Sequence, residues 1–178
     1  GADPRDSAGH SASIIEHLPD ILAEERGSLV LYSSRKQMLE VYAGLPAAFR
    51  ERILVQGDLS KQELIRQHRK RVDEGKPSVI FGLASFAEGV DLPGKYCEHV
   101  VIAKIPFAVP DDPVEAALAE WIEKNGGNPF MEIAVPDASL RLIQACGRLL
   151  RTEQDSGTIT VLDRRLVTQG AAAVPSGN

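Results

Sequence analysis

The alternation of short apolar segments with amphipathic or charged segments constrains the fold of this chain more than any other feature of its sequence. Apolar runs with the length and residue types of buried β-strands lie at residues 28–32, 53–56, 78–81, 99–105 and 158–162. Helical patterns separate them, at residues 14–26, 35–43, 61–74, 114–124 and from 137 onwards. Strands that alternate with helices are typical of a mainly parallel sheet flanked by helices. The sequence therefore predicts an α/β fold.

Local signals support the helix boundaries. Ser34 and Ser60 stand directly before two predicted helices, and Asp137 is expected to cap the last one. Pro19 is expected to interrupt or kink the first helix, and Gly75 to end the helix at 61–74. Segments rich in proline and glycine, at 106–113 and 125–129, are predicted to be loops.

The chain of 178 residues is expected to form one domain with its own hydrophobic core. Its content of 43% hydrophobic and 25% charged residues is that of an ordinary globular protein and excludes disorder of the whole chain. The polar start at 1–13 and the Ala-, Gly- and Ser-rich end at 169–178 are expected to be a flexible extension and a flexible tail. The domain is therefore placed at residues 14–168.

The charge of the chain is unevenly distributed. A formal net charge of −5 argues against a domain that binds nucleic acid through bulk positive charge. Basic side chains nevertheless predominate in residues 61–71, whereas acidic side chains predominate in residues 111–124. A surface polarised in this way is compatible with binding to a phosphate backbone.

The sequence gives little support for metal, disulfide or membrane chemistry. Cys97 and Cys146 are far apart without metal-ligand spacing, and the four histidines form no cluster. The chain has no apolar run long enough to span a bilayer and no signal-peptide pattern at its start. We therefore expect a cytoplasmic protein with no membrane partner and no metal site in this chain.

Segment 140–151 of the last predicted helix has an arginine-rich face and contains no acidic residue. Helical spacing in segment 140–151 places Arg141, Gln144, Arg148 and Arg151 on one face, opposite Leu140, Ile143 and Leu150. Guanidinium groups bind phosphate oxygens in pairs, and two of them one helical turn apart can stabilise the charge that develops during phosphoryl transfer. The alternative is an amphipathic helix with a basic solvated face.

Polar side chains also follow the first predicted strand, at the end where parallel sheets bind phosphates. Ser33, Ser34 and Arg35 offer hydroxyls, helix-start amides and a cation to a backbone phosphate. Ordinary helix capping is the alternative interpretation of the two serines.

The loop at 82–94 follows another strand. Its glycines allow close approach of the backbone to a ligand, Ser85 can donate to a phosphate, and Glu88 and Asp91 can accept from sugar hydroxyls or position an arginine. A long polar turn is the alternative. The pair Asp163-Arg164 after the last strand is either an ion pair or part of a site.

The order of these segments resembles the second motor domain of superfamily 2 helicases of the DinG and XPD type, from about residue 14 to residue 168. The matching stretches lie at 29–35, 55–58, 68–71, 85–92 and 144–151, extended by 163–166. The resemblance implies a RecA-like P-loop NTPase fold. It places Gln144, Arg148 and Arg151 as catalytic residues that face ATP, between two RecA-like domains.

The resemblance also assigns other residues to two ligands. The nucleotide side is expected to include Glu88, Gly89, Asp91 and Gly147, of which the first three couple the cleft to the nucleic-acid groove. The residues expected to face single-stranded DNA are Ser33, Ser34, Arg35, Gln56, Gly57 and Ser85.

The activity implied by the resemblance is ATP-driven movement from 5′ to 3′ along single-stranded DNA, with unwinding of duplexes and DNA junctions in repair and replication. The chain has no G-x-x-x-x-G-K-[ST] phosphate loop and no Asp-Glu-x-His segment. We therefore expect an inactive, monomeric fragment, whose missing N-terminal motor domain binds most of the ATP and Mg²⁺ and carries the family's iron–sulfur cluster. The alternatives are a non-enzymatic nucleic-acid-binding module with the same fold and a small-molecule α/β enzyme.

Overall fold

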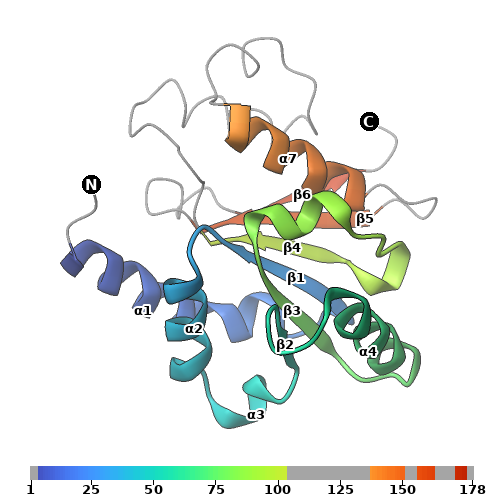
Figure 1. Cartoon of the computed structure of the whole chain (residues 1–178), viewed down its shortest axis with the longest axis horizontal. Coiled ribbons are helices and arrows are strands. Elements are labelled where there is room, and N and C mark those ends of the chain that lie inside the picture. The colour runs from blue at the N-terminus through green and yellow to red at the C-terminus, as the bar shows by residue number, and fades with distance from the viewer. Residues whose placement is uncertain (1–3, 104–136, 151–155, 163–170, 176–178) are drawn as a thin grey trace.

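The computed structural model of this chain describes residues 4–103, 137–150, 156–162 and 171–175 (Figure 1). Its centre is a six-stranded sheet with the order β2-β3-β1-β4-β5-β6. The strands are β1 Gly27–Tyr32, β2 Ile53–Val55, β3 Ser78–Leu83, β4 His99–Ile102, β5 Ser156–Val161 and β6 Ala171–Pro175. The pairs among β1 to β5 are parallel, and β6 pairs with β5 in the antiparallel direction. The predicted α/β fold with a mainly parallel sheet is confirmed.

Helices cover both faces of the sheet. One layer consists of α1 Pro4–Ile21, α2 Arg35–Gly44 and α3 Ala47–Arg50. The other consists of α4 Lys61–Asp73, the 3-10 turns η1 Ala84–Gly89 and η2 Gly94–Tyr96, and α7 Asp137–Leu150. Figure 1 shows α2 and α7 on opposite sides of the strands.

Alternate side chains of each strand supply the two cores between these layers. In β1, Leu29 and Leu31 face the core beneath α4, η1 and α7, whereas Val30 and Tyr32 face the core beneath α1 and α2. All residues of β1 are buried. A strand covered on both faces needs apolar side chains on both, which explains the continuous apolar runs in the sequence.

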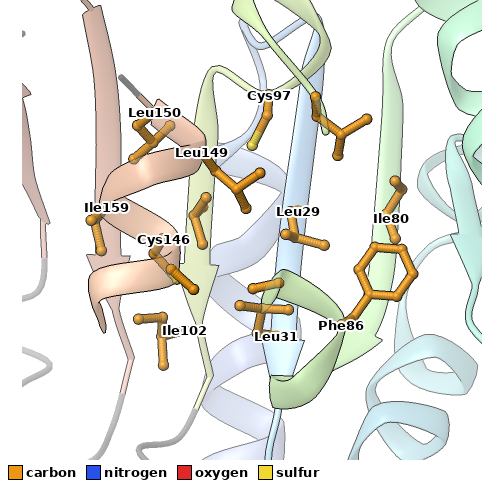
Figure 2. Close-up of a cluster of buried hydrophobic side chains, with 14 of the residues drawn as sticks. Leu29, Leu31, Ile80, Phe86, Cys97, Ile102, Cys146, Leu149, Leu150 and Ile159 are labelled. Carbon is orange, nitrogen blue, oxygen red and sulfur yellow. The ribbon is translucent and has the colours of Figure 1, made fainter. Parts of the chain in front are cut away.

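α7 packs on the first of these cores (Figure 2). Its buried side chains are Leu142, Ala145, Cys146, Leu149 and Leu150. Of the predicted apolar face, Leu150 is buried, while the side chains of Leu140 and Ile143 lie outside the described part. The prediction missed Leu142, Ala145, Cys146 and Leu149, because the buried stripe of α7 is determined by its packing on η1, β4 and β5, which are distant in sequence.

The two ends of the chain differ from the prediction. α1 begins at Pro4 within the segment expected to be a flexible extension, and it continues past Pro19 to Ile21. Its polar residues have partners elsewhere in the fold: His10 Nε2 donates to the Ala103 carbonyl oxygen at 2.5 Å, and Gln37 Nε2 donates to Ser11 Oγ at 3.3 Å. These tertiary contacts are not visible in a local sequence pattern.

The segment expected to be a flexible tail, 169–178, contains β6. Alanine-rich segments have low intrinsic strand propensity. Here the backbone register with β5 defines the strand, with Ala173 opposite Thr158. The helix predicted at 114–124 and the loops predicted at 106–113 and 125–129 lie outside the described residues.

Gly27 makes a close approach of two backbone segments possible. A Cβ added there would overlap the carbonyl oxygen of Tyr96 and lie 2.7 Å from that of Lys95, so η2 crosses the start of β1 only because glycine stands there. We expect Gly27→Ala to lower the free energy of unfolding by about 1–3 kcal/mol, the usual cost of overpacking. Urea unfolding measures this change.

Gly9→Ala is the matched control, because nothing lies within 4 Å of a Cβ added at Gly9 in α1. It should leave stability unchanged or raise it by up to about 1 kcal/mol through helix propensity. Equal effects of the two substitutions would contradict the crowding at Gly27.

Candidate functional site

The carboxyl ends of β1, β2 and β3 meet at one edge of the sheet, because these strands are parallel neighbours. The residues predicted to face single-stranded DNA stand at this edge. Ser33, Ser34 and Arg35 follow β1, Gln56 and Gly57 follow β2, and Ser85 lies in η1 after β3. We call this group the strand-end cluster.

Hydrogen bonds connect the ends of β1, β2 and β3 at the strand-end cluster. Arg35 Nη1 donates to the backbone oxygen of Gln56 at 2.9 Å, and Gln56 Oε1 accepts from the backbone N–H of Leu83 at 2.8 Å. Gly57 has φ +106°, and a Cβ added there would lie 2.6 Å from Arg35 Nη1. Glycine at this position therefore permits both the turn after β2 and the position of the guanidinium.

The serines of the cluster have different roles. Ser34 Oγ accepts from the backbone N–H of Gln37 at 3.2 Å, so the capping interpretation is correct for Ser34. Ser33 and Ser85 are exposed, as are Arg35 and Gly57. The cluster thus presents hydroxyls and one guanidinium to solvent.

A second group of predicted residues surrounds a hollow of about 150 Å³ between α7 and the segment that follows β3. The lining residues are Ala87, Glu88, Val90, Asp91, Leu92, Pro93, Ala145, Arg148 and Leu149. The structure therefore brings Glu88, Asp91 and Arg148 together, from two segments that are distant in sequence. We call this the α7 hollow.

Other predicted residues stand near the α7 hollow without lining it. Gln144 is exposed on α7, and Gly147 is buried. A Cβ added at Gly89 would lie 2.6 Å from Lys61 Nζ, so Gly89 makes room for that ammonium group. Arg151 and the pair Asp163-Arg164 lie outside the described residues.

The charges around the α7 hollow limit what it can hold. Glu88 and Asp91 contribute two carboxylates, against the guanidinium of Arg148. A polyphosphate placed here would meet repulsion from both carboxylates as well as attraction to one arginine. The side chains that line the hollow therefore carry more negative than positive charge.

Lys61 is a neighbour of this region that the sequence predicted only as part of a basic helix. Its Nζ lies 5.2 Å from the centroid of the Phe86 ring, within the range of a cation–π interaction. The position of Lys61 beside Gly89 brings together two residues that are distant in sequence, so a local sequence pattern does not reveal it.

Gly89, Gly94 and Lys95 have the spacing of a G-x-x-x-x-G-K-[ST] phosphate loop, but Tyr96 stands where such a loop has Ser or Thr. The structure gives these residues other contacts. Lys95 Nζ lies 2.9 Å from Asp73 Oδ1, and the Tyr96 hydroxyl donates to the same oxygen at 2.6 Å. The segment connects η1 to η2 instead of a strand to a helix, so it does not form a phosphate loop.

His68 of α4 holds this segment through a hydrogen bond to its backbone. Its Nε2 donates to the backbone oxygen of Tyr96 at 2.7 Å, so Nδ1 of the neutral ring accepts from Ser78 Oγ at 2.8 Å. The side chain is fully buried, and burial lowers the pKa of His68 below its ordinary value of 6.5.

In the part of the chain that the structure describes, no group of three or more His, Cys, Asp or Glu residues is arranged to hold a metal ion. None of the described helices is both long and apolar enough to cross a membrane.

Residues 19–175 of the chain match a family of protein domains described as the helicase C-terminal domain. The chain is 48% identical over 159 residues to the ATP-dependent DNA helicase DinG of Photobacterium profundum, covering 88% of this chain and 23% of that protein. It is 41% identical over 143 residues to the ATP-dependent DNA helicase DinG of Escherichia coli, covering 80% and 20%. The chain thus spans less than a quarter of the length of these curated relatives.

A solved structure named XPD helicase has the same fold. It superimposes with a TM-score of 0.58 at 22% sequence identity, over 88% of this chain and 28% of that one. At this level of identity the likeness concerns the fold alone, and it agrees with the parallel sheet between two helical layers.

The buried His68 predicts acid sensitivity. Because its pKa is lower in the folded than in the unfolded chain, its contribution to stability is fully present above about pH 6.5 and is lost as the pH falls from there toward the folded pKa. We expect His68→Gln to lower the free energy of unfolding at pH 8 by about 1–3 kcal/mol and to flatten its decline between pH 7 and pH 5.

His17→Gln is the control, since His17 is exposed on α1. Denaturant unfolding at several pH values distinguishes the two variants. A decline of unchanged steepness in His68→Gln would show that another group causes the acid sensitivity.

Proposed function

Because this chain belongs to the helicase C-terminal domain family, we propose that it is the second motor domain of an ATP-dependent DNA helicase that moves from 5′ to 3′ along single-stranded DNA. The proposal includes a first motor domain, N-terminal in the same protein, that completes the ATP site. Repair and replication of DNA in the cytoplasm of a bacterium are the proposed setting, and DNA junctions are proposed substrates.

The observation that carries this proposal is the meeting of Glu88, Asp91 and Arg148 at the α7 hollow. Arg148 is exposed there, on a helix whose other face is fixed in the core. A guanidinium on a rigid element is suited to stabilise the charge that develops on a transferring phosphoryl group. We assign Arg148 this role, with Arg151 as its partner and Gln144 as a further contact to the nucleotide.

Two carboxylates and one guanidinium line the hollow, which supports a nucleotide site formed by two domains. We place the phosphates of ATP and the Mg²⁺ ion mainly on the first domain, where a phosphate loop supplies backbone N–H groups. Glu88, Gly89, Asp91 and Gly147 then form the near side of the nucleotide cleft.

The iron–sulfur cluster of such helicases is also placed on the first domain. Cluster ligands are thiolates, and burial raises the pKa of Cys97 to about 12 and raises that of Cys146 as well. Both cysteines are buried in the core beneath α7. They fit a packing role and not a ligand role.

The strand-end cluster is the proposed contact to single-stranded DNA. Arg35 is held by Gln56 and remains exposed, and Ser33, Gly57 and Ser85 are exposed beside it. Guanidinium, hydroxyl and backbone N–H groups are the usual partners of nucleic-acid phosphates. The net charge of −5 does not oppose this proposal, since it depends on local placement of a cation.

ATP turnover tests the proposal. A longer protein that contains this chain and the proposed N-terminal motor domain, here called the restored protein, should hydrolyse ATP with stimulation by single-stranded DNA. This chain alone should not hydrolyse ATP. Arg148→Ala in the restored protein should reduce turnover by about 10³-fold or more and largely retain DNA binding, as for other arginines that contact the transferring phosphoryl group.

Arg66→Ala is a matched control, because Arg66 is an exposed arginine on α4 that pairs with Glu63. Its turnover should equal that of the unaltered protein. If the restored protein hydrolyses no ATP with or without DNA, the result would instead favour a non-enzymatic nucleic-acid-binding module. Normal turnover with loss of DNA binding in Arg148→Ala would reverse the assignment of the two sites.

The strand-end cluster generates a separate prediction. Arg35→Ala should weaken binding of a single-stranded oligonucleotide and reduce the magnitude of the slope of log K against log salt concentration by about 0.7, the value for one lost phosphate contact. Fluorescence anisotropy at several salt concentrations measures both. Lys76→Ala is the control, because the exposed Lys76 precedes β3 at the opposite edge of the sheet. Equal slopes for the two variants would contradict the proposed contact.

A further inference from the structure

We propose that Arg69 is a positioning residue that holds the segment around Asp91 in place and thereby determines how strongly single-stranded DNA stimulates ATP turnover. This inference rests on the proposed function. It assigns a role to a side chain of α4 that lines neither the α7 hollow nor the strand-end cluster.

Arg69 contacts Asp91 mainly through the backbone. Its Nη2 donates to the Asp91 carbonyl oxygen at 2.6 Å, while Asp91 Oδ2 lies 3.7 Å away on a side chain that is 92% exposed. An exposed ion pair at that distance contributes little. The backbone hydrogen bond therefore restrains the segment, and the Asp91 carboxylate remains available to other partners.

The guanidinium of Arg69 is itself fixed by an aromatic ring. Its Cζ lies 4.8 Å from the centroid of the Tyr96 ring, and stacking of this kind orients the planar fork. Tyr96 is anchored through both its backbone and its side chain: the backbone carbonyl accepts from the buried His68, and the hydroxyl at the end of the ring donates to Asp73. Arg69 is thus preorganised for its bond to Asp91.

The restrained segment joins the two parts of the candidate site. Ser85 of the strand-end cluster lies near the start of η1, and Glu88 and Asp91 line the α7 hollow. Between them, Phe86 and Ala87 are buried and pin η1 to the core, where Figure 2 shows Phe86 beside Ile80. After η1 the chain has no strand or helix until η2 begins. Leu92 is buried in the core in this stretch, and the hydrogen bond from Arg69 restrains the exposed Asp91 next to it.

These contacts predict a specific defect when Arg69 is removed. No group that lines the hollow is lost, so the KM for ATP and the turnover without DNA should persist. The position of Asp91 relative to Arg148 becomes less defined, so the response of turnover to DNA should weaken.

Lys95 provides a matched control at the same ring. Its Nζ lies 5.5 Å from the Tyr96 centroid and pairs with Asp73. Within the described residues, no hydrogen bond or ion pair connects it to Asp91. Lys95→Ala therefore removes a cation from the same ring without releasing the segment.

The test compares Arg69→Ala, Arg69→Lys and Lys95→Ala in the protein restored to its N-terminal neighbour. The measured quantities are kcat and KM for ATP, with and without saturating single-stranded oligonucleotide. We expect Arg69→Ala to lower the DNA-stimulated kcat about tenfold, with the unstimulated rate and KM within about twofold of the unaltered protein, a magnitude usual for residues that couple two sites. Arg69→Lys should restore part of the stimulation, because an ammonium group can donate to the same carbonyl but does not form the planar stack.

The outcomes separate this inference from the proposed function. An unaltered protein without DNA-stimulated turnover overturns the proposed function and the role of Arg69 with it. Stimulated turnover in the unaltered protein, with Arg69→Ala equal to Lys95→Ala, overturns only the role of Arg69. Loss of turnover in equal proportion with and without DNA also overturns it, because a merely structural residue has that effect.

Discussion

Parallel backbone pairing of β1 with β3 and β4 is the constraint on which the rest of this structure depends. Parallel strands need a crossover between them, and in the described residues β1, β2 and β3 are each followed by a helix or turn that packs on one of the two faces. The same pairing brings the carboxyl ends of neighbouring strands to one edge. Residues from three separate segments, such as Arg35, Gln56 and Leu83, therefore become neighbours.

Local signals were sufficient to predict much of the fold. The strands were found from their apolar runs, and the caps at Ser34 and Ser60 are confirmed, because capping acts within one helical turn. The start of α1 and the strand β6 were missed because both depend on partners distant in sequence. For the same reason, the buried stripe of α7 was only partly predicted.

The candidate site also contains residues that the sequence identified and residues that only the tertiary contacts reveal. The meeting of Glu88, Asp91 and Arg148 agrees with the resemblance to helicases, although what these residues bind stays a prediction. Arg69 and Lys61 were not singled out, since their significance comes from tertiary contacts with Asp91 and Gly89. A pattern search recognises residues that touch a ligand in a known family more readily than residues that hold those residues in place.

α4 contacts the stretch from Phe86 to Tyr96 along much of its own length. Lys61 meets Gly89 at the start of the helix, Arg69 meets Asp91, and Asp73 meets the hydroxyl of Tyr96 at its end. The helix therefore supports this stretch along its length, and the stretch is not a loop that is free to open independently of α4. Displacing the stretch away from α4 would break these contacts, so the stretch and the helix move together for as long as the contacts persist.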